Sequence, residues 1–214
     1  MSRTIFWDVD TQYDFMRSEG TLYVPDSESI IPALAALTEH AHSHGLVIVA
    51  SADDHEPGHR ELSDVPDWLE TFPPHCMRGT PGQGKIPETT LRRPFVIEPD
   101  PVDPAELAKQ IRVHDGDFLL LKHWFDVFTN ANVGVLLDVL APTDIVLYGV
   151  ALDVCNRYAI EGLLDRLPSA ALWLVQDATR PIHPDRVGAL IEGWTGRGLR
   201  LATIWDVVEG RVPA

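Results

Sequence analysis

Residues 147–158 read LYGVALDVCNRY and place Cys155 where a strand gives way to a helix. The run just before the cysteine, DIVLYGV at 144–150, is apolar without alternation, which is typical of a parallel strand covered on both faces. After Cys155 the apolar residues recur at helical spacing, and Asp153 stands where a side chain could cap the first free amides. We therefore expect a strand, a turn and a helix, with the cysteine at the helix N-terminus.

A thiol at this junction would be well placed for catalysis. Open parallel sheets bind ligands at the carboxyl ends of their strands, and the dipole and free amides of a helix N-terminus stabilise a thiolate. The ordinary alternative is that a free cysteine is a small buried hydrophobic residue. Cys155 therefore needs partners elsewhere in the chain before it can be called a nucleophile.

The rest of the chain alternates between short apolar runs and segments of helical periodicity. Strands are predicted at 3–8, 46–50, 95–97, 118–122, 172–176 and 199–203, and helices at about 27–44, 104–111, 130–140 and 185–194. This alternation predicts one domain over residues 1–214, a three-layer α/β/α sandwich with a mainly parallel sheet.

Composition excludes several classes of protein. Hydrophobic residues make up 45% of the 214 residues and charged residues 23%, and no apolar run approaches the ~20 residues of a membrane helix. Asp8 interrupts the first apolar run, so we expect no signal peptide and a cytoplasmic protein. Two cysteines are too few for a disulfide scaffold. A net charge of −15 disfavours nucleic acids and anionic membranes as partners.

Residues 51–94 are rich in Pro, Gly, His and charged residues, which predicts a long loop over the domain. A metal ion would supply the anchoring that such a loop needs. The segment holds one carboxylate and three imidazoles whose atoms suit Zn²⁺, Fe²⁺ or Mn²⁺: Asp53, His55, His59 and His75. Simple solvation of loop histidines is the alternative, because this spacing is not a strong zinc signature. We expect Cys76, next in the chain, to pack in the core.

Charged residues also end two of the predicted strands. Asp8 and Asp10 stand at the end of the first strand and, by the alternation of an extended chain, are expected to share a side, which would raise the pKa of one carboxyl. A carboxylate here could take a proton from a thiol and return it to a leaving amine, although loop capping is the alternative. Lys122 ends another strand and would lower the pKa of a nearby thiol, unless it is a paired surface lysine.

Several segments together resemble the isochorismatase-like cysteine hydrolases, and among them the nicotinamidase/pyrazinamidase branch. Residues 10–15, DTQYDF, match the D-x-Q-x-D-F opening of that family, and residues 20–25, GTLYVP, resemble its G-x-L-x-V-P continuation. Residues 149–155, GVALDVC, match its G-x-A-x-D-x-C signature, and Lys122 ends the strand that carries the family lysine. The resemblance extends to about residue 178.

The resemblance implies a catalytic triad of Cys155 as nucleophile, Asp10 as proton acceptor and donor, and Lys122 as electrostatic partner. It also implies a cis peptide bond between Val150 and Ala151, with the amides of Ala151 and Cys155 forming an oxyanion hole. A thiolate would attack an amide carbonyl, ammonia would leave, and water would hydrolyse the thioester.

The resemblance further implies one divalent transition metal ion, with Zn²⁺ favoured and Fe²⁺ or Mn²⁺ as alternatives. Asp53, His55 and His75 match the ligands of nicotinamidases, and His59 stands where some members have a further ligand. Isochorismate ether hydrolases share the fold but are not expected to carry these ligands.

For the substrate pocket, Phe15 and Phe72 match positions that flank the pyridine ring, and we add Val150 and Trp124 as pocket residues. Trp124 belongs to the segment HWFDVFTN, residues 123–130, where typical nicotinamidases have a Tyr-Ser-Gly-Phe-type sequence. This departure leaves the substrate open.

We therefore expect a homo-oligomeric amidohydrolase that acts on a small carboxamide, with nicotinamide to nicotinate as the leading case. Another amidase of the family, acting on a ureido, carbamoyl or biuret-like substrate, is the nearest alternative. A non-catalytic domain that binds a metal or a ligand is a second alternative. A nucleotide-binding protein is less favoured, because no glycine-rich phosphate loop follows the first strand.

Overall fold

The computed structural model describes residues 3–212 and contains one seven-stranded sheet in the order β3-β4-β2-β1-β5-β6-β7. Each adjacent pair of strands is parallel, which confirms the expected mainly parallel sheet. The strands are β1 (Thr4–Val9), β2 (Val47–Asp53), β3 (Phe95–Ile97), β4 (Phe118–Lys122), β5 (Asp144–Val150), β6 (Ala171–Arg180) and β7 (Arg200–Ala202).

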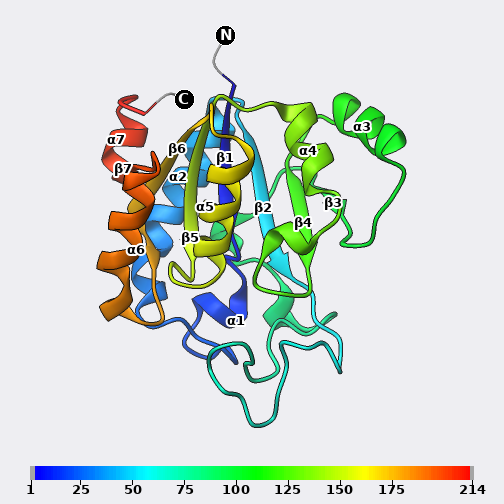
Figure 1. Cartoon of the computed structure of the whole chain (residues 1–214), viewed down its shortest axis with the longest axis vertical. Coiled ribbons are helices and arrows are strands. Elements are labelled where there is room, and N and C mark those ends of the chain that lie inside the picture. Colours follow the sequence, from blue (N-terminus) through cyan, green and yellow to red (C-terminus); the bar gives the residue numbers. More distant parts are fainter. Residues whose placement is uncertain (1–2, 213–214) are drawn as a thin grey trace.

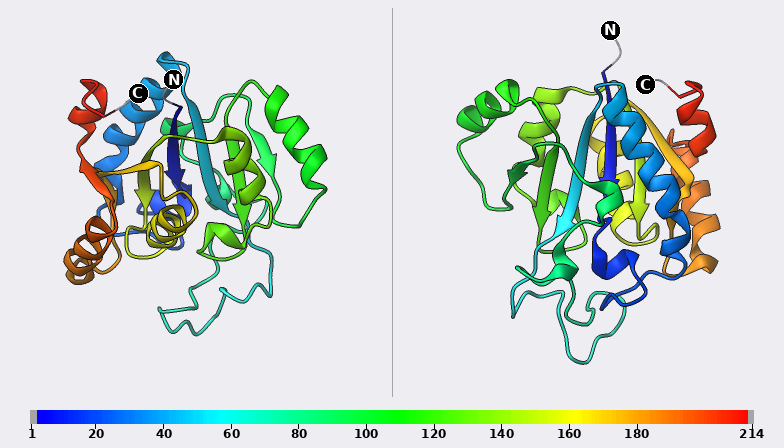
Figure 2. Two further views of the ribbon diagram at one scale, coloured as in Figure 1. Left: turned by 45° about the horizontal axis from the view of Figure 1, so that its top comes forward. Right: turned by 180° about the vertical axis from the view of Figure 1, so that it is seen from behind.

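Helices cover both faces of this sheet, so the chain folds as the expected α/β/α sandwich (Figures 1 and 2). The α-helices are α1 (Tyr13–Met16), α2 (Ile31–Ser43), α3 (Pro104–Val113), α4 (Val133–Leu140), α5 (Cys155–Arg166), α6 (Pro184–Gly196) and α7 (Ile204–Val208). Side chains of α3, α4, α5 and α6 share one core cluster, while those of α2 and α7 belong to the other. None of these helices is long and apolar enough to cross a membrane, over the part of the chain described.

The central strand β1 and its neighbour β5 are buried along their whole length. Trp7 packs with the α4 and α5 layer, whereas its neighbour Phe6 packs with the α2 layer, and both are fully buried. Burying a large apolar side chain stabilises a fold by about 1.5–3 kcal/mol, so both faces of β1 contribute. This two-sided burial explains why these strands are apolar without alternation.

The start of α5 and the length of β6 differ from the sequence-based expectations, and α2 and α4 begin at Ile31 and Val133 rather than at about 27 and 130. Asp153 does not cap α5, whose N-cap residue is Val154 without a side-chain hydrogen bond. Instead, the Asp153 carboxylate accepts hydrogen bonds from the backbone N–H groups of Ile182 (2.7 Å) and His183 (2.8 Å), which ties the chain after β6 to the start of α5. The strand β6 also continues beyond the predicted 172–176, through a register shift opposite β5.

The long loop between β2 and β3 lies beyond the carboxyl ends of the strands, where it protrudes at the bottom of Figure 1. Its regular structure is limited to two short 3₁₀ turns, η2 (Pro81–Gln83) and η3 (Pro87–Thr89), as the Pro- and Gly-rich sequence predicts. Two further 3₁₀ turns, η1 (Ser27–Ile30) and η4 (Val127–Thr129), precede α2 and α4. The loop therefore covers the edge of the sheet where parallel strands present their functional residues.

Candidate active site

Four reactive side chains meet at the carboxyl ends of four strands. Asp10 directly follows β1, Asp53 ends β2, and Lys122 ends β4, while Cys155 begins α5 after the turn that follows β5. Because β2 pairs with both β1 and β4 in parallel, Asp53 stands opposite Lys122 in register, and the ends of the strands meet at the same edge. The fold therefore brings together residues up to 145 positions apart in sequence, from Asp10 to Cys155.

The Lys122 ammonium lies at the centre of this group. Its Nζ atom is 2.9 Å from Asp10 Oδ2, forms an ion pair with Asp53 Oδ1 and points at Cys155 Sγ from 3.8 Å. The hydroxyl of Ser51 donates a 2.6 Å hydrogen bond to the other oxygen of Asp10. All five side chains are buried, so these interactions are little screened by solvent.

The electrostatics of the group assign different protonation states to its members. Burial lowers the pKa of Lys122, but Asp10 and Asp53 outweigh this and raise it well above its usual value, so the amine is charged. Burial raises the pKa of Asp10, opposed by Lys122 and increased further by Asp53. The pKa of Asp53 is instead lowered, because Lys122 and the nearby histidines outweigh its burial.

The two carboxyl groups therefore differ in their affinity for a proton. Asp53 stays ionised beside the ammonium, and Asp10 is the carboxylate that can hold a proton. Burial also raises the pKa of the Cys155 thiol, an effect that Lys122 opposes and Asp10 adds to. A thiol that holds its proton next to a carboxylate that can accept it is the arrangement that general base catalysis requires.

The expected pairing of Asp8 with Asp10 is not formed. Asp10 adopts a left-handed backbone conformation, with φ of 46°, so the alternation of the strand stops before it. Asp8 binds Lys85, with 2.9 Å between Oδ2 and Nζ, and accepts a 3.2 Å hydrogen bond from the Thr11 hydroxyl. The carboxylate that raises the pKa of Asp10 is Asp53, so a proton shared with Asp8 is not supported.

The turn before Cys155 presents two backbone amides. The peptide bond between Val150 and Ala151 is cis, and the N–H groups of Ala151 and Cys155 donate no hydrogen bond to any group within residues 3–212. Gly149 permits this turn, because a Cβ atom there would lie 2.1 Å from the carbonyl oxygen of Val9. Both amides are therefore available to a ligand beside the thiol, as an oxyanion hole requires.

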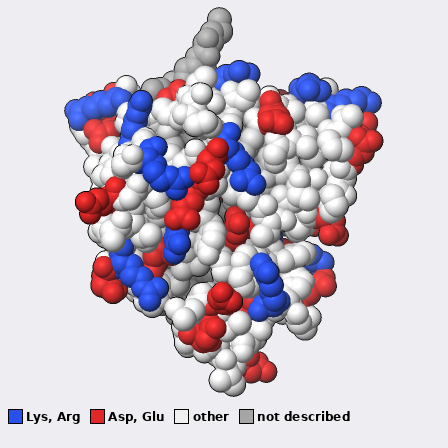
Figure 3. Space-filling model, in the orientation of Figure 1, with Lys and Arg blue, Asp and Glu red and all other residues white. Residues whose placement is uncertain are grey.

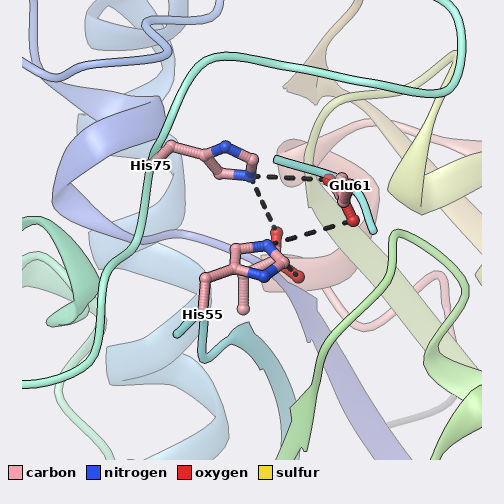
Figure 4. Close-up of side chains that lie close together, drawn as sticks. His55, Glu61 and His75 are labelled. Atoms are coloured by element: carbon pink, nitrogen blue, oxygen red, sulfur yellow. Dashed lines mark ion pairs between the residues drawn. The ribbon is translucent and has the colours of Figure 1, made fainter. Parts of the chain in front are cut away.

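A second cluster adjoins the first through Asp53, and Figure 4 shows how its other members, His55, Glu61 and His75, point toward one another. His75 Nε2 lies 3.8 Å from Asp53 Oδ2 and 3.5 Å from Glu61 Oε1, and His55 Nε2 lies 4.0 Å from Asp53 Oδ1 and 3.9 Å from Glu61 Oε2. The four side chains converge on one point from β2 and from two parts of the long loop, and all are buried.

The atoms of this cluster fit a divalent metal ion. One oxygen of Asp53, one of Glu61 and the Nε2 atoms of His55 and His75 are buried without a hydrogen-bond partner among the described residues. Buried polar atoms are costly unless they are paired or bind a metal. Separations of 3.5–4.0 Å exceed a hydrogen bond, but suit ligand atoms that each lie about 2.0–2.2 Å from one ion. Two imidazoles and two carboxylates suit Zn²⁺, Fe²⁺ or Mn²⁺.

The structure groups Glu61 with the three other residues, whereas His59 lies outside. The His59 ring is half-buried and packs on His123 with 4.3 Å between centroids, and its Nδ1 atom accepts a 3.2 Å hydrogen bond from the N–H of Glu56. Sequence reasoning missed Glu61, since no pattern distinguishes it from other carboxylates of the loop such as Asp64. Only the path of the loop, fixed by bridges such as Leu62 to Phe72, brings it inward.

Side chains of the DTQYDF motif, residues 10–15, hold the backbone segments that carry this cluster. The side chain of Gln12 accepts a 2.7 Å hydrogen bond from the N–H of Asp53 and donates a 2.8 Å bond to its carbonyl oxygen. Asp14 accepts hydrogen bonds from the N–H groups of Cys76 (2.7 Å) and Thr21 (3.1 Å). Cys76 is fully buried, as expected. The motif thus fixes the end of β2 and the returning arm of the loop.

A narrow cavity opens over Cys155. Phe15 and Phe72, the residues expected to flank a substrate ring, both line it. Val150 is fully buried and does not line it, and Trp124 lies farther out, in a larger groove that adjoins the cavity. The structure therefore brings the two phenylalanines to the thiol, but not the other two expected pocket residues.

A buried thiol with its own carboxylate, ammonium and free backbone amides, at the carboxyl edge of a parallel sheet, is the arrangement that a cysteine-dependent hydrolase requires. The chain belongs to the isochorismatase family, because the family model described as "Isochorismatase domain" matches residues 5–205. The family expected from the sequence motifs is thereby confirmed.

Known proteins similar to this chain include amidases. A nicotinamidase/pyrazinamidase of Mycobacterium tuberculosis (strain ATCC 25618 / H37Rv) is 40% identical over 76 residues, which cover 35% of this chain and 39% of that protein. The match thus spans less than half of that relative.

Solved structures match over nearly the whole chain. Pyrazinamidase of Pyrococcus horikoshii in complex with zinc has a TM-score of 0.72 at 21% identity and covers 94% of this chain and 99% of its own. N-carbamoylsarcosine amidase from Thermoplasma acidophilum has a TM-score of 0.69 at 22% identity and covers 95% and 97%. At these identities the likeness shows a shared fold.

Proposed function

We propose that this protein is a metal-containing cysteine amidohydrolase that cleaves a small carboxamide to a carboxylate and ammonia, with nicotinamide to nicotinate as the leading case. The observation that carries the proposal is the contact of one buried ammonium, Lys122, with both a carboxylate, Asp10, and the thiol of Cys155. The curated nicotinamidase/pyrazinamidase relative supports this choice of substrate.

In the first half of the reaction Asp10 takes the proton of the Cys155 thiol. An oxygen of Asp10 and the sulfur lie within 4.8 Å of each other, and Lys122 stabilises the thiolate that forms. The thiolate attacks the amide carbon and a C–S bond forms, while the N–H groups of Ala151 and Cys155 stabilise the negative oxygen. Asp10 then returns the proton to the nitrogen, the C–N bond breaks and ammonia leaves.

In the second half, water hydrolyses the thioester. Asp10 accepts a proton from the attacking water, the C–S bond breaks, and the carboxylate product leaves as the Cys155 thiol regains its proton. Lys122 keeps its charge throughout, because Asp10 and Asp53 raise its pKa well above the usual range despite its burial. Its role is electrostatic rather than that of an acid.

We further propose that Asp53, His55, Glu61 and His75 hold one divalent ion, with Zn²⁺ favoured and Fe²⁺ or Mn²⁺ as alternatives. The zinc complex of the similar P. horikoshii pyrazinamidase supports zinc. When bound, such an ion polarises its ligands and lowers the pKa of a bound water. Asp53 connects the two clusters, since it contacts Lys122 as well as the histidines.

The second candidate is an amidase of the same family that acts on a ureido, carbamoyl or biuret-like substrate. The observation that favours it is the position of Trp124, which lines the outer groove in place of the usual nicotinamidase segment. The similar fold of N-carbamoylsarcosine amidase is consistent with this reading.

A panel of amides tests both candidates. We expect ammonia release from nicotinamide, with an equal amount of carboxylate, and loss of that release after removal of the metal by a chelator. Release from N-carbamoyl amino acids or biuret, but not from nicotinamide, would favour the second candidate. No release from any of these compounds by metal-loaded protein would contradict the amidohydrolase proposal.

A further inference from the structure

The cavity over Cys155 opens into a larger groove of about 630 Å³, bordered by the long loop and by the first turns of α5 and α6. The cavity and the groove share Phe72, Val154 and Ile182 as lining residues. A substrate whose amide lies against Cys155 therefore has its far end directed into the groove.

Three arginines line this groove: Arg60 from the loop, Arg157 from α5 and Arg186 from α6. Arg157 donates a 3.1 Å hydrogen bond to Glu161 on its own helix. Arg60 and Arg186 form no ion pair with a carboxylate within the described residues 3–212. Figure 3 shows basic side chains on either side of the hollow above the protruding loop. Two guanidinium groups are thus free to bind an anion.

Among the described residues, two acidic side chains also line the groove, but they form no ion pair with these arginines. They are Glu70 and Asp153, and both oxygens of Asp153 are occupied by the N–H groups of Ile182 and His183. Arginines therefore outnumber carboxylates in the groove, whereas the chain as a whole has 32 acidic and only 17 basic residues. An acidic protein that gathers unpaired arginines at the mouth of its site attracts anions there.

Arg60 is also held in a defined orientation. Its guanidinium carbon lies 3.7 Å from the centroid of the Trp124 ring, which is the geometry of a cation–π contact. Stacking on a ring leaves the N–H groups at the edge of the guanidinium free for a planar, two-oxygen acceptor such as a carboxylate. Trp124, in the segment after Lys122 that differs from typical nicotinamidases, thus holds the Arg60 guanidinium in position to bind an anion.

We infer that the site also accepts an amide that carries a carboxylate, which binds the stacked guanidinium of Arg60 while the amide lies at Cys155, with Arg186 adding to the positive charge of the groove. This inference rests on the proposed amidase function and names its substrate class. Neutral nicotinamide leaves the two arginines unused. A carboxylated carboxamide or a carbamoyl amino acid uses both ends of the site.

Binding to the Cys155→Ala protein tests the inference without turnover. The probes are 4-carbamoylbenzoate against benzamide, and succinamate against butyramide, pairs that differ by a carboxylate. We expect the carboxylated member of at least one pair to bind about tenfold more tightly, as for a charged, two-point contact in a partly exposed groove. Added salt should weaken this preference.

Substitutions in the Cys155→Ala background identify the groups responsible. Arg60→Ala and Arg186→Ala should each reduce the preference several-fold, and Arg60→Lys should retain part of it. The matched control is Arg112→Ala, because Arg112 is an exposed arginine of α3 that does not line the groove. Equal binding within both pairs, or an equal loss in Arg112→Ala, would overturn the inference.

The inference and the proposed function can fail separately. Ammonia release by the native protein decides the function, whereas the binding preference decides the substrate class. A preference for carboxylates without ammonia release from any amide would support the groove and contradict the amidase. Ammonia release without a binding preference for carboxylates would support the amidase function and contradict the carboxylate-binding groove.

Discussion

Asp53 stands opposite Lys122 in the β2–β4 pairing, and its carboxylate belongs to two clusters at once. One oxygen pairs with the Lys122 ammonium, and the other lies 3.8 Å from Nε2 of His75. The group of Asp10, Lys122 and Cys155 and the candidate metal-binding cluster are therefore joined by a single buried side chain. Asp53 contacts both clusters, whereas His75 belongs to only one, so substitutions of these two residues should have different effects on Cys155.

Asp53→Asn should affect both clusters, whereas His75→Ala should affect only the metal. We expect both variants to lose bound metal and ammonia release. Only Asp53→Asn should also change the rate at which iodoacetamide alkylates Cys155, because it alters the charge beside Lys122. Metal analysis and alkylation rates measure the two effects, and identical alkylation rates in the two metal-depleted variants would refute the separation.

Glu61→Gln should weaken metal retention by at least about 10- to 100-fold, since it removes a charged ligand from the buried cluster. His59→Ala should retain the metal, because His59 lies outside the group of ligand atoms and touches it only at His55, with 3.4 Å between their Nδ1 atoms. Glu56→Gln is the matched control, being an exposed glutamate of the same loop. Metal content after dialysis against a weak chelator is the measurement, and loss in His59→Ala with retention in Glu61→Gln would reverse our assignment.

Metal affinity should fall as the pH falls below about 9. Burial lowers the pKa of His75, but Asp53 and Glu61 outweigh this and raise it to about 9, so the ring carries a proton in the metal-free protein at neutral pH. Burial lowers the pKa of His55 to about 4, so that ring is already neutral. The ion must displace the His75 proton, which weakens apparent affinity about tenfold per pH unit. Calorimetry should detect the released proton between pH 6 and 8, and a pH-independent affinity would disagree.

Lys122→Met should destabilise the fold by about 3–5 kcal/mol, because it leaves the buried carboxylates of Asp10 and Asp53 without their counter-charge. Asp10→Asn combined with Lys122→Met should cost less than the sum of the single variants. Unfolding in urea measures these free energies. Strict additivity would mean that the ion pair contributes nothing to the fold.

Sequence reasoning located the residues that end regular strands. Asp10, Lys122 and Cys155 each follow a recognisable apolar run, and the parallel topology brings such ends together. Asp8 and Asp10 do not share a side as expected, because the left-handed conformation of Asp10 ends the strand geometry there. A single backbone dihedral angle of this kind leaves no trace in the hydrophobic pattern.

The sequence predicted an irregular loop over residues 51–94, but it did not predict the path of that loop. Its composition predicted irregular structure, yet the burial of Glu61 depends on how the chain folds back between residues 54 and 94. Asp153 illustrates the same limit, since its carboxylate binds amides from a segment about 30 residues away rather than the adjacent helix. Local patterns specify elements, whereas contacts between irregular segments depend on the tertiary fold.

Ammonia release by the native protein and by Cys155→Ala tests the central claim most directly, with Cys76→Ala as the matched cysteine control. With metal-loaded protein and an amide that the native chain hydrolyses, Cys155→Ala should lose at least about 10³-fold in kcat, as expected for removal of a nucleophile. Cys76→Ala should keep most of the activity, since Cys76 packs in the core. A Cys155→Ala protein that releases ammonia at the native rate would contradict the assignment of this thiol as the nucleophile.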